Sequence, residues 1–351
     1  MPQQHQPFAT IKLDAPYALF LGAETQETYV KTAIGVRDWC NEKCIAQVRL
    51  TDETVDLGLP DVALEQLSEY GVKSLLIGTA SVGGGFPDAW LQPIETAVRS
   101  GVHIISGLHS RLRDVPALVA AAQQSGAQLI DVRVPPASLP VGTGQKRAGK
   151  RLLTVGTDCA VGKKYTALAI ARAMQEQGWD AQFRATGQTG IMIAGGGIPI
   201  DAVISDFITG AAELISPEAA PDHWDVIEGQ GALLHPGYCA VSHGLLVGSQ
   251  PDAIVVCHEA GRDTISDWEH FALPPIEDVI ARNLETGKLT NPAVECVGIS
   301  VNTSKLTAPE ADDLKHQLSE KHALPVIDPV RDGAGPIVAT ILERGLADGR
   351  R

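Results

Sequence analysis

Residues 152–174, LLTVGTDCAVGKKYTALAIARAM, place an apolar run, a glycine-framed turn with a lysine and an alanine-rich segment in direct succession. This order predicts a strand, a loop and a helix, which is the layout of a phosphate-binding loop. The glycines let backbone N–H groups converge on a phosphate, the helix adds its positive end, and Lys163 supplies a point charge. We therefore predict that a phosphate compound binds here; a plain strand-turn-helix is the alternative.

The first half of the chain alternates short apolar runs with amphipathic stretches. The apolar runs occupy residues 17–22, 44–50, 74–80, 103–107 and 128–133, and helical patterns at 61–71 and 115–126 lie between them. Buried parallel strands that alternate with helices predict a doubly wound, Rossmann-like sheet. In such sheets, ligands gather at the carboxyl ends of the strands.

The domain boundary is expected near the middle of the chain. A sequence of 351 residues is too long for one comfortable core. Residues 134–151, VPPASLPVGTGQKRAGKR, combine proline, glycine and basic residues without periodicity, which is typical of a linker. We predict an α/β protein with a Rossmann-like doubly wound domain over residues 1–140 and a P-loop NTPase-like α/β domain over residues 141–351, which binds the phosphate-bearing cofactor.

Composition excludes several classes of function. Lys and Arg total 28 against 42 Asp and Glu, and the resulting net charge of −14 opposes binding to nucleic acid or to an anionic membrane. No window approaches about 18 uninterrupted apolar residues, and the N-terminus lacks the order of a signal peptide. The six cysteines contain no CxxC pair, which favours reduced thiols and argues against a zinc site. We expect a soluble, cytoplasmic protein.

Two predicted strand ends in the first half carry unusual residues. Residues 78–90, GTASVGGGFPDAW, place three glycines after a strand, and residues 106–114, SGLHSRLRD, place His109, Arg111 and Arg113 after the next. Both stretches fit a flexible turn followed by the start of a helix. They also fit an anion-binding or substrate loop, in which His109 would contact the substrate.

The phosphate loop has five residues between Gly156 and Gly162, one more than the common form, and it begins with GTD. In this it resembles dethiobiotin synthetase and its relatives. FRATGQTGIMI (183–193), WDVIEGQGAL (224–233) and CVGISVNTSKL (296–306) extend the resemblance. It implies that Arg184 contacts the substrate, that Glu228 ends a strand beside the site, and that Asn302 reads the nucleotide base.

A further stretch, IDPVRDG, contains Asp328 and Arg331 and resembles the base-side loop of the same class. Asp-Pro is also routine turn chemistry, so a structural turn is the alternative. The stretch CHEAGRDTI (257–265) ends another predicted strand, and its Arg262 is a candidate substrate ligand or a partner in a local salt bridge.

Joined together, these motifs resemble a narrower family. GTDCAVGK, the segment from Arg184 to residue 213, IEGQGALLHPGY and LPVIDPVRDG follow a Rossmann-like half with GTASVGGGFPDAW and SGLHSRL. They are similar, over roughly residues 15–345, to a P-loop-domain family long without an assigned function that includes D-glutamate N-acetyltransferase. The resemblance implies transfer of acetyl from acetyl-CoA to D-glutamate or a similar acidic amino acid, in D-amino-acid catabolism.

Lys164 supports a cofactor that needs no metal. In a Mg-nucleotide enzyme, the Ser or Thr after the loop lysine ligates the metal, which Lys164 cannot do. Thr166 lies on a different face of the helix, because adjacent positions differ by about 100°. A loop that holds diphosphate without Mg²⁺ suits coenzyme A, so we expect acetyl-CoA as co-substrate and no bound metal. The residues expected to bind it are Gly156, Thr157, Asp158, Cys159, Ala160, Val161, Gly162, Lys163, Lys164 and Tyr165, with Asn302 and Arg331.

The implied reaction sets chemical requirements that sort the remaining candidates. A protonated amine must lose its proton, for which Glu228 is the first candidate base and His235 the second. Substrate carboxylates are best held by arginine, so Arg184 is the candidate partner. Gln188, Thr189 and Gly190 form a predicted loop that could contact the substrate. Structural roles, as a strand cap, a buried histidine, an ion pair or a tight turn, are the alternatives.

Two other classes of function stay open. An ATP- and Mg-dependent ligase similar to dethiobiotin synthetase would need Asp158 or Glu228 to hold the metal, and a nucleotide-binding regulator would bind without turnover. Residues 198–215, IPIDAVISDFITGAAELI, have helical spacing and predict a turn and a core helix, with Asp201 or Asp206 near the site or a partner subunit. Such an apolar helix is a candidate contact in a homo-oligomer.

Overall fold

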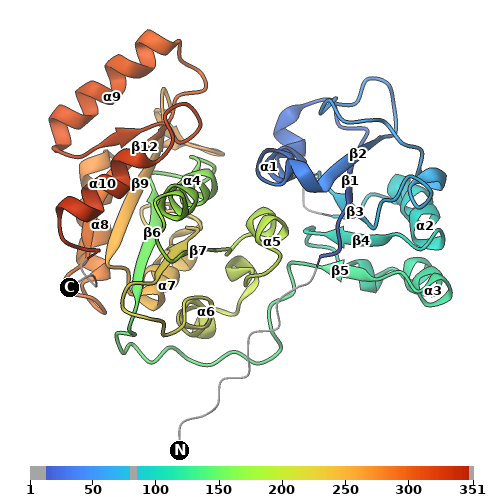
Figure 1. Cartoon of the computed structure of the whole chain (residues 1–351), viewed down its shortest axis with the longest axis horizontal. Coiled ribbons are helices and arrows are strands. Elements are labelled where there is room, and N and C mark those ends of the chain that lie inside the picture. Colours follow the sequence, from blue (N-terminus) through green and yellow to red (C-terminus); the bar gives the residue numbers. More distant parts are fainter. Residues whose placement is uncertain (1–12, 80–84, 348–351) are drawn as a thin grey trace, which may run out of the picture. The chain divides into compact units, whose positions relative to one another are not determined.

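The computed structural model describes residues 13–79 and 85–347, which form two compact units (Figure 1). Of the described residues, 13–79, 85–135 and 187–199 form the N-terminal unit, and 136–186 and 200–347 form the P-loop unit. Part of the predicted glycine loop at 78–90 lies outside the described residues. Within residues 13–79 and 85–347, no helix is both long and apolar enough to cross a lipid bilayer.

The N-terminal unit is built on a five-stranded parallel sheet with the order β2-β1-β3-β4-β5. Its elements are β1 (Tyr17–Gly22), α1 (Lys31–Trp39), β2 (Cys44–Arg49), β3 (Ser74–Ile77), α2 (Leu91–Arg99), β4 (His103–Ser106), α3 (Pro116–Ser125) and β5 (Leu129–Asp131). Figure 1 shows α1 on one side of the strands and α2 and α3 on the other. The five apolar runs of the first half are therefore confirmed as the strands of a doubly wound sheet.

One predicted helix of this unit is wrong. Residues 61–71 form only a short 3-10 helix, Leu64–Gln66, followed by turns. The chain is held at the edge of the sheet instead, because Gln47 of β2 forms an isolated parallel bridge with Asp61 and accepts a hydrogen bond from the amide of Val62. Along this path, the side chains of Val62 and Leu67 are buried. Their apolar spacing therefore reflects burial and does not require a helix.

The P-loop unit is built on a six-stranded parallel sheet with the order β13-β12-β9-β6-β8-β7. Its elements are β6 (Lys150–Gly156), α4 (Lys163–Glu176), β7 (Ala181–Arg184), α6 (Ile208–Ile215), β8 (Trp224–Ile227), α7 (Cys239–Ser249), β9 (Ala253–Glu259), α8 (Ile276–Gly287), β12 (Glu295–Asn302), α9 (Ala308–His322), β13 (Val326–Ile327) and α10 (Gly335–Glu343), with a hairpin of β10 (Thr264–Ile265) and β11 (Trp268–Ala272). From β6 the chain continues to β7 and β8 on one side and then crosses back to β9 on the other, so the strand order reverses at β6. Ligands bind at such a reversal in open α/β sheets.

The helix predicted over residues 198–215 begins later than expected. Two 3-10 helices, Ile200–Ala202 and Ser205–Phe207, precede α6. The apolar face of α6 is buried inside its own unit, where Gly244 and Gly248 of α7 allow Ile208 and Thr209 to approach closely. This packing accounts for the apolar spacing, and the predicted homo-oligomer stays a prediction.

A short helix, α5 (Gln188–Ala194), belongs to the N-terminal unit although it follows β7 in sequence. It packs beside α1, where the hydroxyls of Thr32 and Thr189 lie 3.2 Å apart. The prediction of a loop at residues 188–190 is therefore wrong, because Gln188 is the first residue of this helix.

Candidate functional site

The phosphate loop joins β6 to α4 at the centre of the six-stranded sheet. Gly156 ends β6, and a Cβ atom there would lie 2.9 Å from Cγ2 of Val161. Ala160 and Gly162 both adopt left-handed backbone conformations, with φ of 56° and 103°. Alternation of this kind turns successive N–H groups towards one concavity, and the first turn of α4 adds N–H groups that have no acceptor within the helix. The loop geometry predicted for phosphate binding is present.

Lys163 is the first residue of α4 and is buried at the base of the loop. Its Nζ donates a hydrogen bond of 2.7 Å to the carbonyl oxygen of Asp158. Burial lowers the pKa of Lys163 below its ordinary value of 10.5. Gly229, directly after β8, makes room for this side chain, because a Cβ there would lie 1.7 Å from the Thr154 carbonyl and 3.1 Å from Cδ of Lys163. The glycine that follows Glu228 is therefore required by packing.

Asp158 is fully buried and is neutralised by the chain itself. Its Oδ2 accepts hydrogen bonds from Nη1 of Arg262 at 2.8 Å and from the amide of Ser266 at 2.9 Å. Its Oδ1 accepts the amide of Cys159. Arg262 also donates to the carbonyl of Cys159 and pairs with Glu259. Asp158 thus connects the phosphate loop to the segment after β9. Arg262 has hydrogen-bond and ion-pair partners within the chain, and the role of Arg262 as a substrate ligand stays a prediction.

His235 completes this buried cluster. Its Nδ1 accepts hydrogen bonds from the amides of Gly237 and Tyr238 at 3.0 and 3.1 Å, so the proton of the neutral ring lies on Nε2. Nε2 is 3.6 Å from Oδ1 of Asp158. The rings of Tyr238 and Trp268 pack against the imidazole. The histidine therefore presents an N–H group to the loop carboxylate.

Asp158, Cys159 and His235 bring their potential ligand atoms within 4.8 Å of one another, the spacing of a possible metal site. The hydrogen bonds argue against it. A metal-bound Nε2 would leave the proton on Nδ1, where two backbone donors already point. Burial raises the pKa of the Cys159 thiol, which disfavours the thiolate that binds metals. The hydrogen bonds of His235 and the raised pKa of the Cys159 thiol support the prediction that no metal binds, which stays a prediction.

The helix positions after Lys163 also differ from those of a Mg-nucleotide site. Lys164 lies with its Nζ 5.1 Å from the centre of the Tyr165 ring. The hydroxyl of Thr166 donates to the carbonyl of Gly162 and lies 2.7 Å from the hydroxyl of Ser300 in the core. Thr166 therefore faces the sheet, as the helical spacing predicted, and does not replace the missing Ser or Thr.

Glu228 follows β8 and is 4% exposed. One carboxylate oxygen accepts the amide of Thr186 at 3.0 Å, and the Glu228 carbonyl accepts the Thr186 hydroxyl at 2.6 Å. The side-chain amide of Gln230 donates to that same hydroxyl. These bonds fix a buried carboxylate at the end of β8, the strand next to β6.

Arg184 ends β7, but its side chain returns towards the amino end of the sheet. Its Nε donates to Oδ1 of Asp225 at 2.5 Å, and Nε2 of His223 lies 3.1 Å from the same oxygen. Asp225 is the second residue of β8 and pairs with Arg151 near the start of β6. The ion pair gives Arg184 a structural partner away from the phosphate loop, and its contact with substrate stays a prediction.

Asn302 and the loop after β13 form one hydrogen-bonded group. Asp328 accepts the amide and hydroxyl of Thr303 on one oxygen and the amides of Val330 and Arg331 on the other. Burial alone would raise the pKa of Asp328, but these hydrogen bonds outweigh it and lower the pKa. The guanidinium of Arg331 donates to the carbonyls of Thr303 and Leu306. Asn302 and Arg331, distant in sequence, thus lie in one loop pair beside β12.

The remaining candidates lie in the N-terminal unit. A Cβ atom at Gly107, directly after β4, would lie 1.9 Å from Oε1 of Gln188, so α5 packs over the end of that strand. Gly190 is buried in this helix. His109 follows Gly107 by two residues and contacts the guanidinium of Arg133. This end of the sheet also has a cavity of about 350 Å³ lined by Phe86, Asp88, Arg111 and Asp114 among others.

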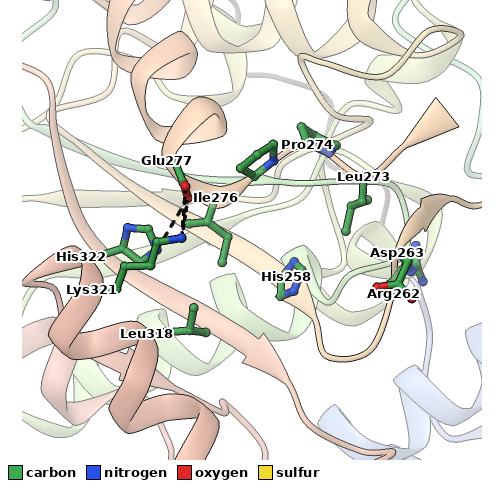
Figure 2. Close-up of a pocket in the computed structure, with 11 residues that line it drawn as sticks. His258, Arg262, Asp263, Leu273, Pro274, Ile276, Glu277, Leu318, Lys321 and His322 are labelled. Atoms are coloured by element: carbon green, nitrogen blue, oxygen red, sulfur yellow. Dashed lines mark hydrogen bonds and ion pairs between the residues drawn. The ribbon is translucent and has the colours of Figure 1, made fainter.

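A second cavity, of about 260 Å³, opens in the P-loop unit and was missed from the sequence (Figure 2). Figure 2 shows His258 in its middle, Arg262 and Asp263 at one end, and Glu277, Lys321 and His322 at the other. We call it the His258 pocket. His258 was visible as a strand-end histidine, but no spacing rule joins it to residues at 273–277 and 318–322.

Comparisons with known proteins match nearly the whole chain. Two described families match it: "Domain of unknown function (DUF1611_N) Rossmann-like domain" over residues 47–135 and "Domain of unknown function (DUF1611_C) P-loop domain" over residues 140–338. A D-glutamate N-acetyltransferase of Pseudoalteromonas sp is 45% identical over 331 residues, which cover 94% of this chain and 100% of that protein. A D-glutamate N-acetyltransferase of Tritonibacter scottomollicae is 43% identical and covers 93% of this chain and 98% of its own length. The crystal structure of a DUF1611 family protein from Anabaena variabilis has 34% identity and a TM-score of 0.85, covering 94% of this chain and 100% of that chain.

Proposed function

Because the chain belongs to the DUF1611 family and carries both its Rossmann-like and its P-loop domain, we propose that it is an N-acetyltransferase that moves acetyl from acetyl-CoA to the amine of D-glutamate. Two relatives with this name, at 45% and 43% identity over nearly the full length, support the activity. We place the reaction in D-amino-acid catabolism, as the sequence resemblance implies, and in the cytoplasm, as expected from the absence of a signal-peptide pattern in the sequence.

The observation that carries the donor assignment is the chemistry of the phosphate loop. Lys163 and the N–H groups of the loop offer donors to a diphosphate. The position after Lys163 is another lysine, and the Thr166 hydroxyl is bonded to Gly162 and Ser300. The Asp158 carboxylate is occupied by Arg262 and Ser266. A loop with such donors, in which the Thr166 hydroxyl and the Asp158 carboxylate already have partners within the chain, suits a diphosphate that is held and not hydrolysed.

The rest of the coenzyme has a candidate position. Asn302, at the end of β12, uses its Oδ1 to accept the amide of Ser304, and we assign its side-chain N–H groups to the ligand. Asp328 and Arg331 hold the neighbouring loop in place through backbone bonds. We assign the adenine to this loop pair, in agreement with the role that the resemblance to dethiobiotin synthetase implies for Asn302.

Acetyl-CoA supplies a thioester, from which the acetyl carbon passes to the amine nitrogen while its bond to sulfur breaks. The chain must take the proton of the amine. We assign this role to Glu228, because its carboxylate is buried at the end of β8, next to the strand that leads into the phosphate loop, and accepts the amide of Thr186. His235 is the weaker candidate, since Nδ1 already accepts two amides and Nε2 holds the proton that faces Asp158.

The test is mass spectrometry of the products formed from acetyl-CoA and a panel of D- and L-amino acids, with and without EDTA. We expect acetylated D-glutamate in both conditions, because no metal is required by the assigned residues. Glu228→Gln should lower kcat with little change in KM for acetyl-CoA, whereas Glu285→Gln, an exposed matched change on α8, should change neither. Mg-dependent hydrolysis of ATP without any acetylated product would replace the transferase with the ligase.

A further inference from the structure

The His258 pocket adjoins the phosphate loop through two of its lining residues. Nδ1 of His258 lies 3.2 Å from the hydroxyl of Thr157, the first residue after β6. Arg262 lines the same pocket and donates to the carboxylate of Asp158 and the carbonyl of Cys159. A molecule whose diphosphate sits on the loop therefore has this pocket as its immediate neighbour.

The lining of the pocket carries no net charge at neutral pH. Arg262 and Lys321 contribute two positive charges, and Asp263 and Glu277 contribute two negative ones. Lys321 is paired with Glu277, with Nζ 3.1 Å from Oε1. Burial lowers the pKa of both His258 and His322, so both imidazoles are mainly neutral. This balance disfavours a phosphate, a carboxylate or an ammonium group as the occupant.

The walls instead suit an uncharged chain that has both apolar and hydrogen-bonding groups. Leu273, Pro274, Ile276 and Leu318 supply the apolar surface. The side chain of His322 is 7% exposed; its Nε2 lies 4.0 Å from Oε2 of Glu277, and among the described residues it makes no hydrogen bond. A buried polar atom of this kind is costly unless a ligand or water meets it. The occupant should therefore carry an amide or hydroxyl group opposite His322.

We propose that the His258 pocket binds the pantetheine arm of the acyl donor, an aliphatic chain with two amides that is attached to the diphosphate. The assignment rests on the proposed function. The pocket volume of about 260 Å³ lies below the range of about 300–1,000 Å³ for pockets that enclose a whole drug-sized ligand. It fits one part of the donor, and the adenine is already assigned to the Asn302 loop.

The experiment compares two ligands by calorimetry on the full-length protein: coenzyme A, and adenosine 3′-phosphate 5′-diphosphate, which lacks only the arm. The wild type should bind coenzyme A about tenfold or more tightly than the shortened nucleotide, because only coenzyme A fills the pocket. Leu318→Trp, which fills the pocket with a ring, should remove this difference and leave the shortened nucleotide unchanged. Leu342→Trp, at a 51% exposed position on α10, is the matched control and should bind both ligands as the wild type does.

A second variant tests the Nε2 nitrogen of His322 directly. His322→Leu keeps an apolar wall but removes the hydrogen-bonding group, so we expect the affinity for coenzyme A to fall about fivefold while the shortened nucleotide binds as before. Unchanged binding of that nucleotide also shows that each variant is folded and keeps its phosphate loop.

Four results would overturn the proposal. Equal affinity of the wild type for both ligands, or no effect of Leu318→Trp, would show that the arm lies elsewhere while leaving the transferase intact. An equal loss for both ligands in Leu318→Trp would assign the pocket to the adenosine end. Failure of the wild type to bind either ligand would contradict the coenzyme A assignment of the phosphate loop, and with it this proposal.

Discussion

The two ends of the six-stranded sheet in the P-loop unit both bury charged side chains, yet they use them differently. At the amino end, Arg151 is 0% exposed, and its guanidinium donates to the carbonyls of Ser216, Arg147, Gly149, Ala148 and Pro217. At the carboxyl end, Lys163 is also buried, and its Nζ donates to the carbonyl of Asp158 beside a loop with converging N–H groups. The amino end satisfies its charge within the chain, and the carboxyl end keeps donors for a ligand.

This contrast shows that burial of a charge does not by itself indicate function. A guanidinium group has five N–H donors, so one that donates to five carbonyl oxygens has none left for a substrate. A lysine at the start of a helix, with a pKa lowered by burial, gains most when an anion arrives. The distinction depends on where each donor points, which the residue type does not reveal.

The largest predicted effect separates the two ends by stability. Arg151→Ala removes the donors of several buried carbonyls, and we expect the free energy of unfolding to fall by about 3–5 kcal/mol, as when a buried charged network is broken. Chemical denaturation measures it, with the exposed Arg282→Ala as control. Coenzyme A affinity, measured where the variant is folded, should be unchanged. A stable variant with lost affinity would place Arg151 in the binding site and remove the contrast.

The second prediction concerns the carboxyl end. Lys163→Ala should weaken the binding of coenzyme A by about 1–3 kcal/mol, the range for loss of a charged hydrogen-bond partner. The effect on the free energy of unfolding should be smaller, because burial of this ammonium is itself unfavourable. Calorimetry and denaturation together test this, with Lys288→Ala, an exposed lysine after α8, as the matched control. Unchanged affinity in a folded variant would remove Lys163 from the site.

The sequence predicted the carboxyl end well because its signal is local. A strand, glycines at fixed offsets and a helix that begins at Lys163 all lie within residues 150–176. The five strands of the N-terminal unit were equally visible as apolar runs. The predicted helix at 61–71 failed because a backbone bridge to Gln47 decided the path of the chain. Burial gives the same apolar spacing whether or not a helix forms.

Side-chain direction was the part that spacing did not reveal. Arg184 ends a strand, where substrate ligands gather, but its side chain turns back to Asp225. Gln188 follows the same strand by four residues and belongs to the N-terminal unit. The His258 pocket combines three segments from different parts of the chain, so only the folded structure brings Leu273, Leu318 and His322 together.

The third prediction concerns Arg184. The sequence resemblance implies that its side chain contacts the substrate at the carboxyl end of the sheet, whereas the structure pairs it with Asp225 towards the amino end. Arg184→Lys keeps the charge but loses the planar guanidinium that meets the buried Asp225, so we expect the free energy of unfolding to fall by about 1 kcal/mol. The KM for D-glutamate should not change, and Arg282→Lys serves as the exposed control. If KM rises while unfolding is unaffected, Arg184 contacts the substrate, as the resemblance implies.

The last and smallest effect is a proton taken up on binding. Burial holds the pKa of Lys163 below 10.5, so at a pH between its lowered pKa and 10.5 the free protein has lost part of this proton. A diphosphate beside Nζ favours the charged form and raises the pKa again, so binding takes up protons and weakens as pH rises through that window. For the protein without ligand, the unfolded chain binds more protons in the same window, so stability rises with pH there.

Calorimetry of coenzyme A binding in two buffers of different ionisation enthalpy measures the uptake. We expect it to persist in Lys288→Met and to vanish in Lys163→Met; uptake that survives in Lys163→Met would assign the proton to another group and leave the carboxyl end of the sheet without its charged donor.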